Sequence, residues 1–298
     1  MRLFAFLCLF LLASAAAAKE PGVPEPIVFD AWEGPPLRVY ALRPDSAADD
    51  APVVFVMHGV NRDADRYFAE WRPLAERYGF VIVVPEFSSS DFPRADNYNL
   101  GGVVGEGGRA ADRNRWAFSA IEPMFDFVRE RFGLAAERYV LYGHSAGAQF
   151  AHRFALFGAG PRARMVISAN AGWYTFPDAG KWPYGPDGLP AEAFDPAEAL
   201  AAPLVVLAGE ADVDPNHASL RRTPEAMAQG ATRFARARAF YLAGAKLSVK
   251  LGAGFGWSCV TAPGVDHDDA KAAPFAVALI LGPPPRVGAP CYKGERAD

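Results

Sequence analysis

The stretch Tyr139-Val140-Leu141-Tyr142-Gly143-His144-Ser145-Ala146-Gly147 joins a short apolar run to a helical pattern that begins at Ala146. Its last five residues match the pattern G-x-S-x-G. In that pattern a serine lies on a sharp strand-to-helix turn, and the flanking glycines let the strained backbone approach its neighbours closely. A serine hydroxyl becomes a nucleophile when a base removes its proton. We therefore predict that Ser145 is a nucleophile and that the backbone N–H of Ala146 helps to form an oxyanion hole.

On both sides of this turn, short β-rich runs alternate with longer helical patterns. This alternation predicts an α/β fold with a mostly parallel sheet that is covered by helices on both faces. The expected strands are Val53 to Met57, Phe80 to Val84, Tyr139 to Tyr142, Met165 to Ser168 and Leu204 to Ala208, with an antiparallel pair at the amino-terminal edge, Ile27 to Trp32 and Leu37 to Leu42. The expected helices are Phe68 to Tyr78, Arg115 to Phe132, Ala146 to Phe157, Pro224 to about Leu242, and Asp268 to Leu281.

A second oxyanion donor is expected in the loop after the strand Val53 to Met57, where the chain reads His58-Gly59-Val60-Asn61. We predict that the donor is the backbone N–H of Val60, and Asn61 is the alternative because only backbone geometry decides between them. His58 precedes the serine in the chain. It is interpreted as a residue that stabilises the turn, since the G-x-S-x-G pattern places its base last in chain order.

The acid and the base are expected downstream of Ser145, in the order Asp or Glu, then His. The strand Leu204 to Ala208 continues into Gly209-Glu210-Ala211-Asp212-Val213-Asp214. We predict Asp212 as the acid that orients the imidazole, and Asp214 is the alternative. His267, in a loop before the last expected helix, is the predicted base. The other downstream or adjacent histidines lie beside the nucleophile, inside its helix, or too close to the acid: His144, His152 and His217.

The composition describes a globular chain with one expected export signal. The 298 residues are 51% hydrophobic and carry a formal net charge of −4, which argues against a nucleic-acid partner. Residues 1–18 read as a secretory signal peptide because Arg2 is followed by a short apolar run and then by small residues. A short membrane anchor is the alternative, although a span takes ~20 apolar residues. We expect a secreted or periplasmic protein with no membrane segment after cleavage, and the sequence leaves its oligomeric state unknown.

Two cysteines remain after the expected cleavage, Cys259 and Cys291. In an oxidising compartment we predict that they form a disulfide, with two free thiols as the alternative. The bond would tie the tail at residues 283–298 to the region of the last strand. Neither cysteine has a second cysteine or a histidine at metal-ligand spacing, so we predict no metal site.

The chain resembles the α/β-hydrolase superfamily, and more narrowly it is similar to secreted bacterial serine esterases of the polyhydroxybutyrate-depolymerase-like and feruloyl-esterase-like type. The residues that carry the resemblance are His58-Gly59, the motif at 143–147, Gly209-x-x-Asp212 and Gly264-x-x-His267. The resemblance implies an eight-stranded sheet, a loop or cap insertion after strand six, no cofactor, and ester hydrolysis as the commonest activity. It covers roughly residues 27–282, so residues 19–298 are expected to form a single α/β-hydrolase domain. The chain lacks a recognisable polymer-binding module.

Two long segments rich in glycine, proline and aromatic residues, 87–112 and 173–194, resist assignment, and such loops are usually functional. We predict that residues 173–195 form a lid or wall in which Trp173, Tyr174 and Trp182 bind an apolar part of a small-molecule or oligomeric ester, the alternative being that these rings only pack onto the core. Arg233, Arg236 and Arg238 are interpreted as a solvated basic face. The leading interpretation is a serine esterase that acts through an acyl-enzyme; a serine peptidase, an acyltransferase and a non-catalytic binding protein are the alternatives.

Overall fold

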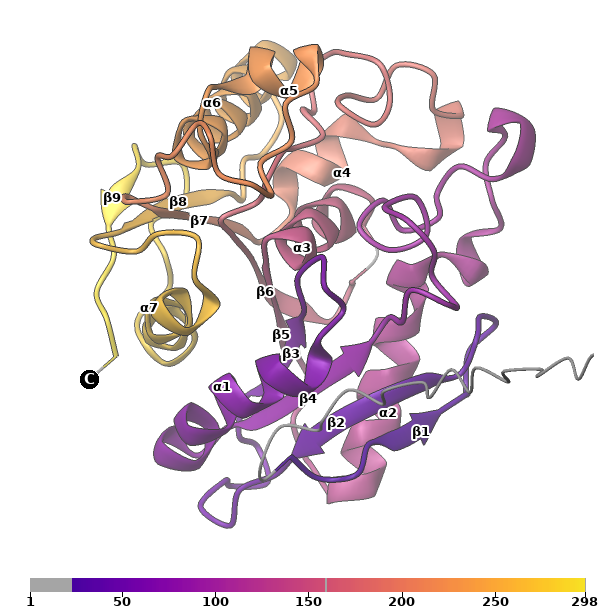
Figure 1. Ribbon diagram of the computed structural model, residues 1–298, viewed down its shortest axis with the longest axis vertical. Helices are drawn as coiled ribbons and strands as arrows, with labels where there is room; N and C mark the ends of the chain where they lie inside the picture. The colour runs from indigo at the N-terminus through magenta and orange to yellow at the C-terminus, as the bar shows by residue number, and fades with distance from the viewer. Residues whose placement is uncertain (1–22, 159, 298) are drawn as a thin grey trace, which may run out of the picture.

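The computed structural model describes residues 23–158 and 160–297, so the predicted signal peptide lies outside the described residues. Within them, nine strands form one sheet in the order β1-β2-β4-β3-β5-β6-β7-β8-β9 (Figure 1). The strands are β1 (Ile27–Phe29), β2 (Leu37–Leu42), β3 (Val53–Met57), β4 (Val81–Glu86), β5 (Tyr139–His144), β6 (Ala163–Ala169), β7 (Leu204–Gly209), β8 (Ser258–Ala262) and β9 (Tyr292–Lys293).

The predicted fold class is confirmed. β2 pairs in antiparallel fashion with β1 and with β4, and all other neighbouring strands are parallel. The sheet has nine strands rather than the expected eight because the tail adds β9 beside β8. A two-residue strand is too short to produce a period in the sequence, and a disulfide at Cys291, directly before β9, binds the tail to β8.

That disulfide joins Cys259 and Cys291, as predicted, with the two Cα atoms 4.5 Å apart. Cys259 is fully buried near the amino end of β8. Further backbone hydrogen bonds hold the tail on the same edge, including Gly294 N–H to the Thr261 carbonyl at 2.7 Å and Gly288 N–H to the Trp257 carbonyl at 2.9 Å.

Helices cover both faces of the sheet because its central strands are apolar on both sides. In β3, Val53, Phe55 and Met57 pack into one hydrophobic cluster, and Val54 and Val56 pack into the other. The side with Val54 is covered by α1 (Ala64–Tyr78) and α7 (Asp269–Leu281), which lie together in Figure 1. The opposite side is covered by α2 (Ile121–Phe132), α3 (Ala146–Leu156), α4 (Pro196–Ala201) and α6 (Arg233–Leu251).

The expected helix from Pro224 to about Leu242 is two helices, α5 (Pro224–Gln229) and α6. The break falls at Gly230, whose φ of 148° is incompatible with a helix and with most side chains. Each helix begins with its own threonine cap, because Thr223 Oγ1 accepts from Ala226 N–H and Thr232 Oγ1 accepts from Ala235 N–H.

The two unassigned segments are mainly irregular. Within and next to residues 87–112 and 173–194, the described residues form two isolated β-bridges, Val104 with Ala110 and Lys181 with Asp187, and short 3₁₀ turns at Glu106–Gly108, Arg113–Arg115, Ala117–Ala120 and Ala191–Ala193. The second segment follows β6, at the position expected for an insertion. No helix in the described part of the chain has the length and apolarity that crossing a membrane requires.

Candidate active site

Ser145 occupies the turn between β5 and α3, at the carboxyl end of the central strand. Its backbone has φ 57° and ψ −111°, a strained conformation for a residue with a side chain. The glycines of the motif make that turn possible. A Cβ on Gly147 would overlap the carbonyl oxygen of Met57, and one on Gly143 would overlap the carbonyl oxygen of Gly147. The turn thus holds the Ser145 hydroxyl at the carboxyl edge of the sheet, where the ends of β3, β7 and β8 also lie.

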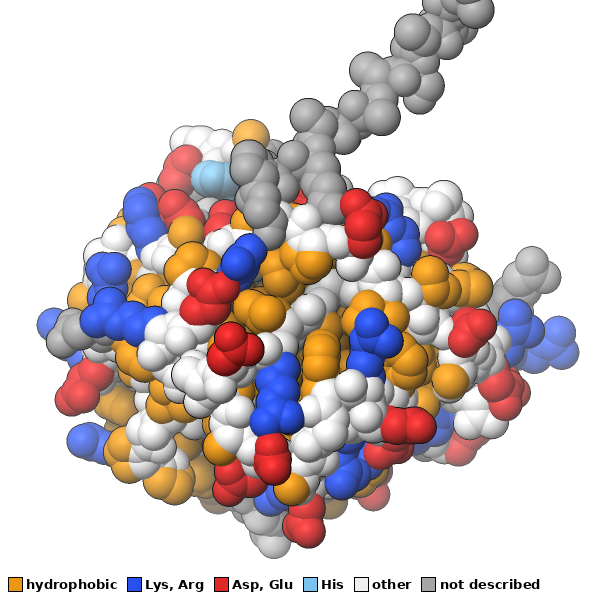
Figure 2. Space-filling view, turned by 90° about the horizontal axis from the view of Figure 1, so that it is seen from below, with side chains coloured by type: hydrophobic (Ala, Val, Ile, Leu, Met, Phe, Trp, Pro, Cys, Tyr) orange, Lys and Arg blue, Asp and Glu red, His pale blue; other side chains and the backbone are white. Residues whose placement is uncertain are grey.

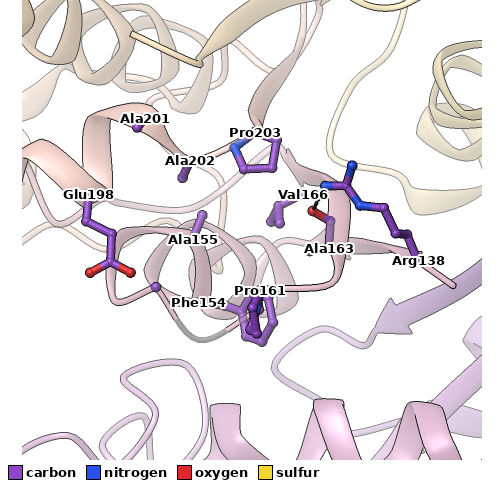
Figure 3. Close-up of a pocket in the computed structure, with 12 residues that line it drawn as sticks. Arg138, Phe154, Ala155, Pro161, Ala163, Val166, Glu198, Ala201, Ala202 and Pro203 are labelled. Atoms are coloured by element: carbon purple, nitrogen blue, oxygen red, sulfur yellow. Dashed lines mark hydrogen bonds between the residues drawn. The ribbon is translucent and has the colours of Figure 1, made fainter. Parts of the chain in front are cut away.

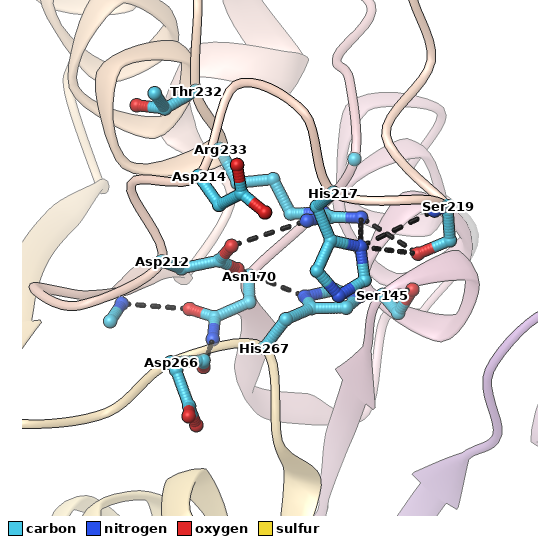
Figure 4. A network of polar contacts seen from close by, with 12 residues as sticks. Ser145, Asn170, Asp212, Asp214, His217, Ser219, Thr232, Arg233, Asp266 and His267 are labelled. Atoms are coloured by element: carbon cyan, nitrogen blue, oxygen red, sulfur yellow. Dashed lines mark hydrogen bonds and ion pairs between the residues drawn. The ribbon is translucent and has the colours of Figure 1, made fainter.

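His267 lies in the loop that follows β8 and contacts both other predicted residues. Its Nε2 is 3.0 Å from Ser145 Oγ, and its Nδ1 is 2.9 Å from Asp212 Oδ2 (Figure 4). The structure therefore brings Ser145, His267 and Asp212 into one hydrogen-bonded chain, although they are separated by up to 122 residues in sequence.

The structure places the two candidate acids in different surroundings. Asp212 is 3% exposed and points at His267. Asp214 is exposed, and its carboxylate accepts from the backbone N–H of Asn216 at 2.8 Å.

Asn170, which the sequence reasoning missed, connects the loops that carry the acid and the base. It follows β6 with a positive φ of 52° and is 2% exposed. Its amide donates to the Asp266 carbonyl at 2.7 Å, and its side-chain oxygen accepts from Gly209 N–H at 2.7 Å. The combination of positive φ and two loop contacts suits asparagine, which tolerates the left-handed region. Only its place two residues after the predicted strand Met165 to Ser168 hinted at such a role.

Burial decides the direction of the pKa shift at His267. The histidine has its pKa lowered from the ordinary value of 6.5, with desolvation as the largest cause. The hydrogen bond to Asp212 acts in the opposite sense, and the positive charge of Arg233 adds to the lowering. His267 is accordingly neutral, and able to accept a proton, at neutral pH.

The loop after β3 borders the same cavity as Ser145. This cavity of about 200 Å³ is lined by Gly59, Val60, Asn61, Ser145 and Ser219, among others. Val60 is 63% exposed, and an oxyanion role for its backbone N–H stays a prediction. Ala146 opens α3, and the first N–H groups of a helix have no acceptor within the helix. Val60 thus lines the cavity that Ser145 lines, and Ala146 directly follows Ser145 in the chain.

His58 stabilises the loop after β3. It is fully buried, its Nδ1 is 3.1 Å from the Gly59 carbonyl oxygen, and its Nε2 accepts from Phe87 N–H at 3.0 Å. Its carbonyl in turn accepts from the Tyr98 hydroxyl at 2.7 Å. Burial lowers the pKa of His58 to about 4, so this histidine is a neutral structural residue at physiological pH.

The interpretation of Arg233 and Arg236 as part of a solvated basic face is wrong. Arg233 is 2% exposed and Arg236 is fully buried, and only Arg238 of the three is exposed. The break at Gly230 starts α6 afresh and turns the first two arginines toward the protein. Arg233 pairs with Asp212, with Arg233 Nη1 3.2 Å from Asp212 Oδ1. Sequence gave no signal for this pair, because it joins residues 21 positions apart across a loop.

The predicted aromatic residues do not border the cavity at Ser145. Trp173 is 3% exposed and Tyr174 is fully buried, with the Tyr174 ring stacked on Phe240 at 4.5 Å. Trp182 borders a separate cavity of about 210 Å³ together with Leu100 and residues of the 87–112 segment. Among the cavities found in the described residues, those next to Ser145 and His267 are lined by other side chains, so a role of these rings in substrate binding stays a prediction.

A second cavity, of about 470 Å³, adjoins the first and shares Arg66, His144 and His267 with it. Its other lining residues are mostly polar and acidic: Glu70, His217, Asp266, Asp268 and Asp269. Asp269 is buried and accepts from Tyr142 O–H at 2.6 Å and Trp71 Nε1–H at 3.1 Å, which ties the start of α7 to β5 and α1. Burial raises the pKa of this carboxyl group.

One further cavity lies away from this site. A cavity of about 430 Å³ lies at the amino ends of β5, β6 and β7, beside Arg138, Ala163 and Pro203 (Figure 3). On the face shown in Figure 2, basic side chains lie among acidic ones without forming a patch of one sign. In the described part of the chain, no three His, Cys, Asp or Glu side chains are grouped so that they could hold a metal ion.

Comparisons with known proteins agree with this architecture. The chain is similar to poly(aspartic acid) hydrolase-1 from Sphingomonas sp. KT-1, with 41% identity over 88% of this chain and 99% of that chain and a TM-score of 0.82. It is also similar to LpqC, a poly(3-hydroxybutyrate) depolymerase from Bordetella parapertussis, with 32% identity over 83% and 85% of the two chains and a TM-score of 0.76.

An S-formylglutathione hydrolase from Agrobacterium tumefaciens shares the fold, with 17% identity over 83% and 91% of the two chains and a TM-score of 0.54. No curated protein sequence matches the chain. Residues 38–169 match the family described as Esterase PHB depolymerase. Because this match adds to the two close structural relatives, the chain belongs to the PHB depolymerase esterase family and is a hydrolase with the α/β-hydrolase fold.

Proposed function

We propose that the protein is a serine hydrolase that cleaves carboxylic esters through an acyl-enzyme on Ser145. The observation that carries the proposal is the hydrogen-bonded chain from Ser145 Oγ through His267 to Asp212, at the carboxyl edge of the sheet. His267 is the general base, Asp212 orients it, and the N–H groups of Val60 and Ala146 are the oxyanion donors.

The reaction proceeds in two halves. Ser145 Oγ attacks the carbonyl carbon of the ester while His267 Nε2 takes the hydroxyl proton. The tetrahedral intermediate then loses the alcohol, which leaves with the proton from His267. Water, deprotonated by His267, attacks the acyl-enzyme, and the carboxylic acid is released with Ser145 restored.

The experiment combines active-site labelling with turnover. A fluorophosphonate probe is expected to label the wild-type protein at Ser145 and to leave Ser145→Ala unlabelled. The same variant should keep its fold, checked by circular dichroism, and lose on the order of 10⁶-fold in kcat on p-nitrophenyl acetate. Activity of Ser145→Ala near that of the wild type would overturn the assignment, and a folded wild type that takes no label and cleaves no ester would favour a binding protein.

A substrate panel separates the remaining classes. It contains p-nitrophenyl esters of increasing chain length, poly(3-hydroxybutyrate), poly(aspartic acid) and aminopeptidase substrates, since the two close relatives are named for the two polymers. We expect the short esters to be cleaved. Faster cleavage of the peptide substrates would indicate a peptidase, and transfer of the acyl group to an added alcohol in preference to water would indicate an acyltransferase.

We further infer that residues 19–298 form one domain that is secreted or periplasmic. Strands from Ile27 to Lys293 belong to the same sheet, which supports a single domain. The disulfide supports an oxidising compartment. Amino-terminal sequencing of exported protein tests the expected cleavage before Lys19.

A further inference from the structure

The Asp212 carboxylate has two charged or chargeable partners, one on each oxygen. Oδ2 faces His267 Nδ1 at 2.9 Å, and Oδ1 accepts from Arg233 Nη1 at 3.2 Å. The side chains of Asp212 and Arg233 are 3% and 1% exposed. A buried carboxylate needs a counter-charge or it takes up a proton, so Arg233 supplies what the buried acid requires.

This pairing also constrains the direction of the carboxylate. A carboxylate held at one oxygen only can rotate about its last bond, whereas contacts at both oxygens define its plane. Arg233 comes from the first turn of α6 and Asp212 from the loop after β7, so the ion pair fixes that loop against a helix. In Figure 4 one dashed line joins the carboxylate to the guanidinium and another joins it to the imidazole, so each partner contacts a different oxygen.

The same guanidinium reaches the wall of the cavity beside Ser145. Arg233 Nη2 donates to Ser219 Oγ at 2.9 Å and lies 3.4 Å from His217 Nδ1. Ser219 lines the cavity that contains Ser145, and His217 packs edge-on against His267 with ring centroids 5.2 Å apart. One buried cation therefore contacts the acid and, at the same time, the loop segment that borders the base.

We propose that Arg233 is the positioning residue of this active site: it holds the Asp212 carboxylate in the plane that presents Oδ2 to His267, and its contacts with His217 and Ser219 hold the guanidinium in place for that task. This inference rests on the proposed function of Ser145, His267 and Asp212, and it adds a fourth residue that acts through Asp212 without touching substrate.

The charge of Arg233 gives the proposal a signature that packing alone would not produce. Arg233 is one of the causes that lower the pKa of His267, so its removal should raise that pKa. The substitution leaves the other titratable or charged groups around His267 unchanged. These groups are His144 of β5, Arg66 and Glu70 of α1, Asp212 and His217 of the loop after β7, Asp266, Asp268 and Asp269 around the start of α7, and Lys271, which is bound to Asp266.

The test compares Arg233→Met and Arg233→Lys with two arginines of the same helix. Arg233→Met is expected to lower kcat on p-nitrophenyl acetate about 10- to 100-fold, by analogy with the loss seen when a partner that orients a metal-ligating side chain is removed. The acid limb of its kcat/KM profile should move to higher pH. Arg233→Lys keeps the charge, so the limb should return to its wild-type position and part of kcat should be recovered.

Two control variants distinguish the effect of the contacts that Arg233 makes from the effect of removing any buried arginine of α6. Arg236 is buried one turn further along, and its guanidinium donates to the backbone carbonyls of Gly172, Arg221 and Gly230. Arg236→Met should lower the melting temperature and leave the acid limb unmoved. Arg238 is exposed, and Arg238→Met should match the wild type in both rate and limb.

A double-mutant cycle keeps the proposal testable even if Arg233→Met folds poorly. Asp212→Asn removes the carboxylate, and Arg233→Met in that background leaves neither buried charge unpaired. If Arg233 acts through Asp212, the double variant is no slower than Asp212→Asn. A further loss of 10-fold or more, or an acid limb that stays in place in Arg233→Met, would overturn the proposal while fluorophosphonate labelling of Ser145 in the wild type still supports the proposed function.

Discussion

Reduction of the Cys259–Cys291 disulfide should lower the stability of the protein and leave its kcat/KM unchanged. The bond closes a loop with a sequence separation of 32. In the chain-entropy treatment, opening a loop of that length costs about 3.7 kcal/mol of stability at 25 °C, because the unfolded chain gains freedom. With an unfolding entropy of roughly 2.1 cal/mol/K per residue, the melting temperature should fall by about 6 °C. Cys259 lies near the amino end of β8, away from Ser145, so kcat/KM should not change.

The assay is thermal unfolding of the same preparation before and after treatment with a thiol reductant, which changes no amino-acid residue. Mass spectrometry of non-reduced digests verifies the bond, and a p-nitrophenyl acetate assay in the reductant follows activity. A melting temperature that shifts by less than 1 °C would refute the loop-closure reasoning. Free thiols at both cysteines would refute the bond itself.

Three further outcomes are expected. Asp212→Asn should lower kcat about 10⁴-fold because the imidazole of His267 would lose the partner that sets its tautomer. Asp214 is exposed, so Asp214→Asn should keep kcat within about threefold of the wild type, and the reverse ranking in ester assays would move the acid role to Asp214. The acid limb of kcat/KM should lie below pH 6.5 because burial disfavours the charged form of His267, and a profile from pH 4 to 9 with a limb above 6.5 would contradict this direction. The free energy of unfolding should also fall between pH 6.5 and about 4, because the unfolded chain binds a proton at His58 in this range and the folded protein does not; urea titrations that give equal stability at pH 7 and 4.5 would contradict this.

Local sequence determined the part of the site that lies within a few residues of Ser145. The strand, the two glycines and the following helix are adjacent in the chain, and the backbone can make the turn only because glycine carries no Cβ at positions 143 and 147. The candidate acid and base also followed from sequence, because the G-x-S-x-G pattern places an acid and then a histidine downstream of the serine, and Asp212 follows a predicted strand. The cysteine pair followed from its number and compartment.

Tertiary structure alone decided the features that depend on how distant segments pack. The direction in which Arg233 and Arg236 point was set by the break at Gly230, and a basic helix face looks the same in sequence whether it meets water or a buried carboxylate. The sign of the pKa shift at His267 depended on the balance between burial and the Asp212 hydrogen bond. The burial of Trp173 and Tyr174 was also decided by tertiary structure. An aromatic pair after a strand is compatible with a lid and with a core, and the position of α6, on which Tyr174 stacks, decided between them. Periodicity reports the local path of the chain, whereas desolvation and ion pairing depend on neighbours that the chain brings together only by folding.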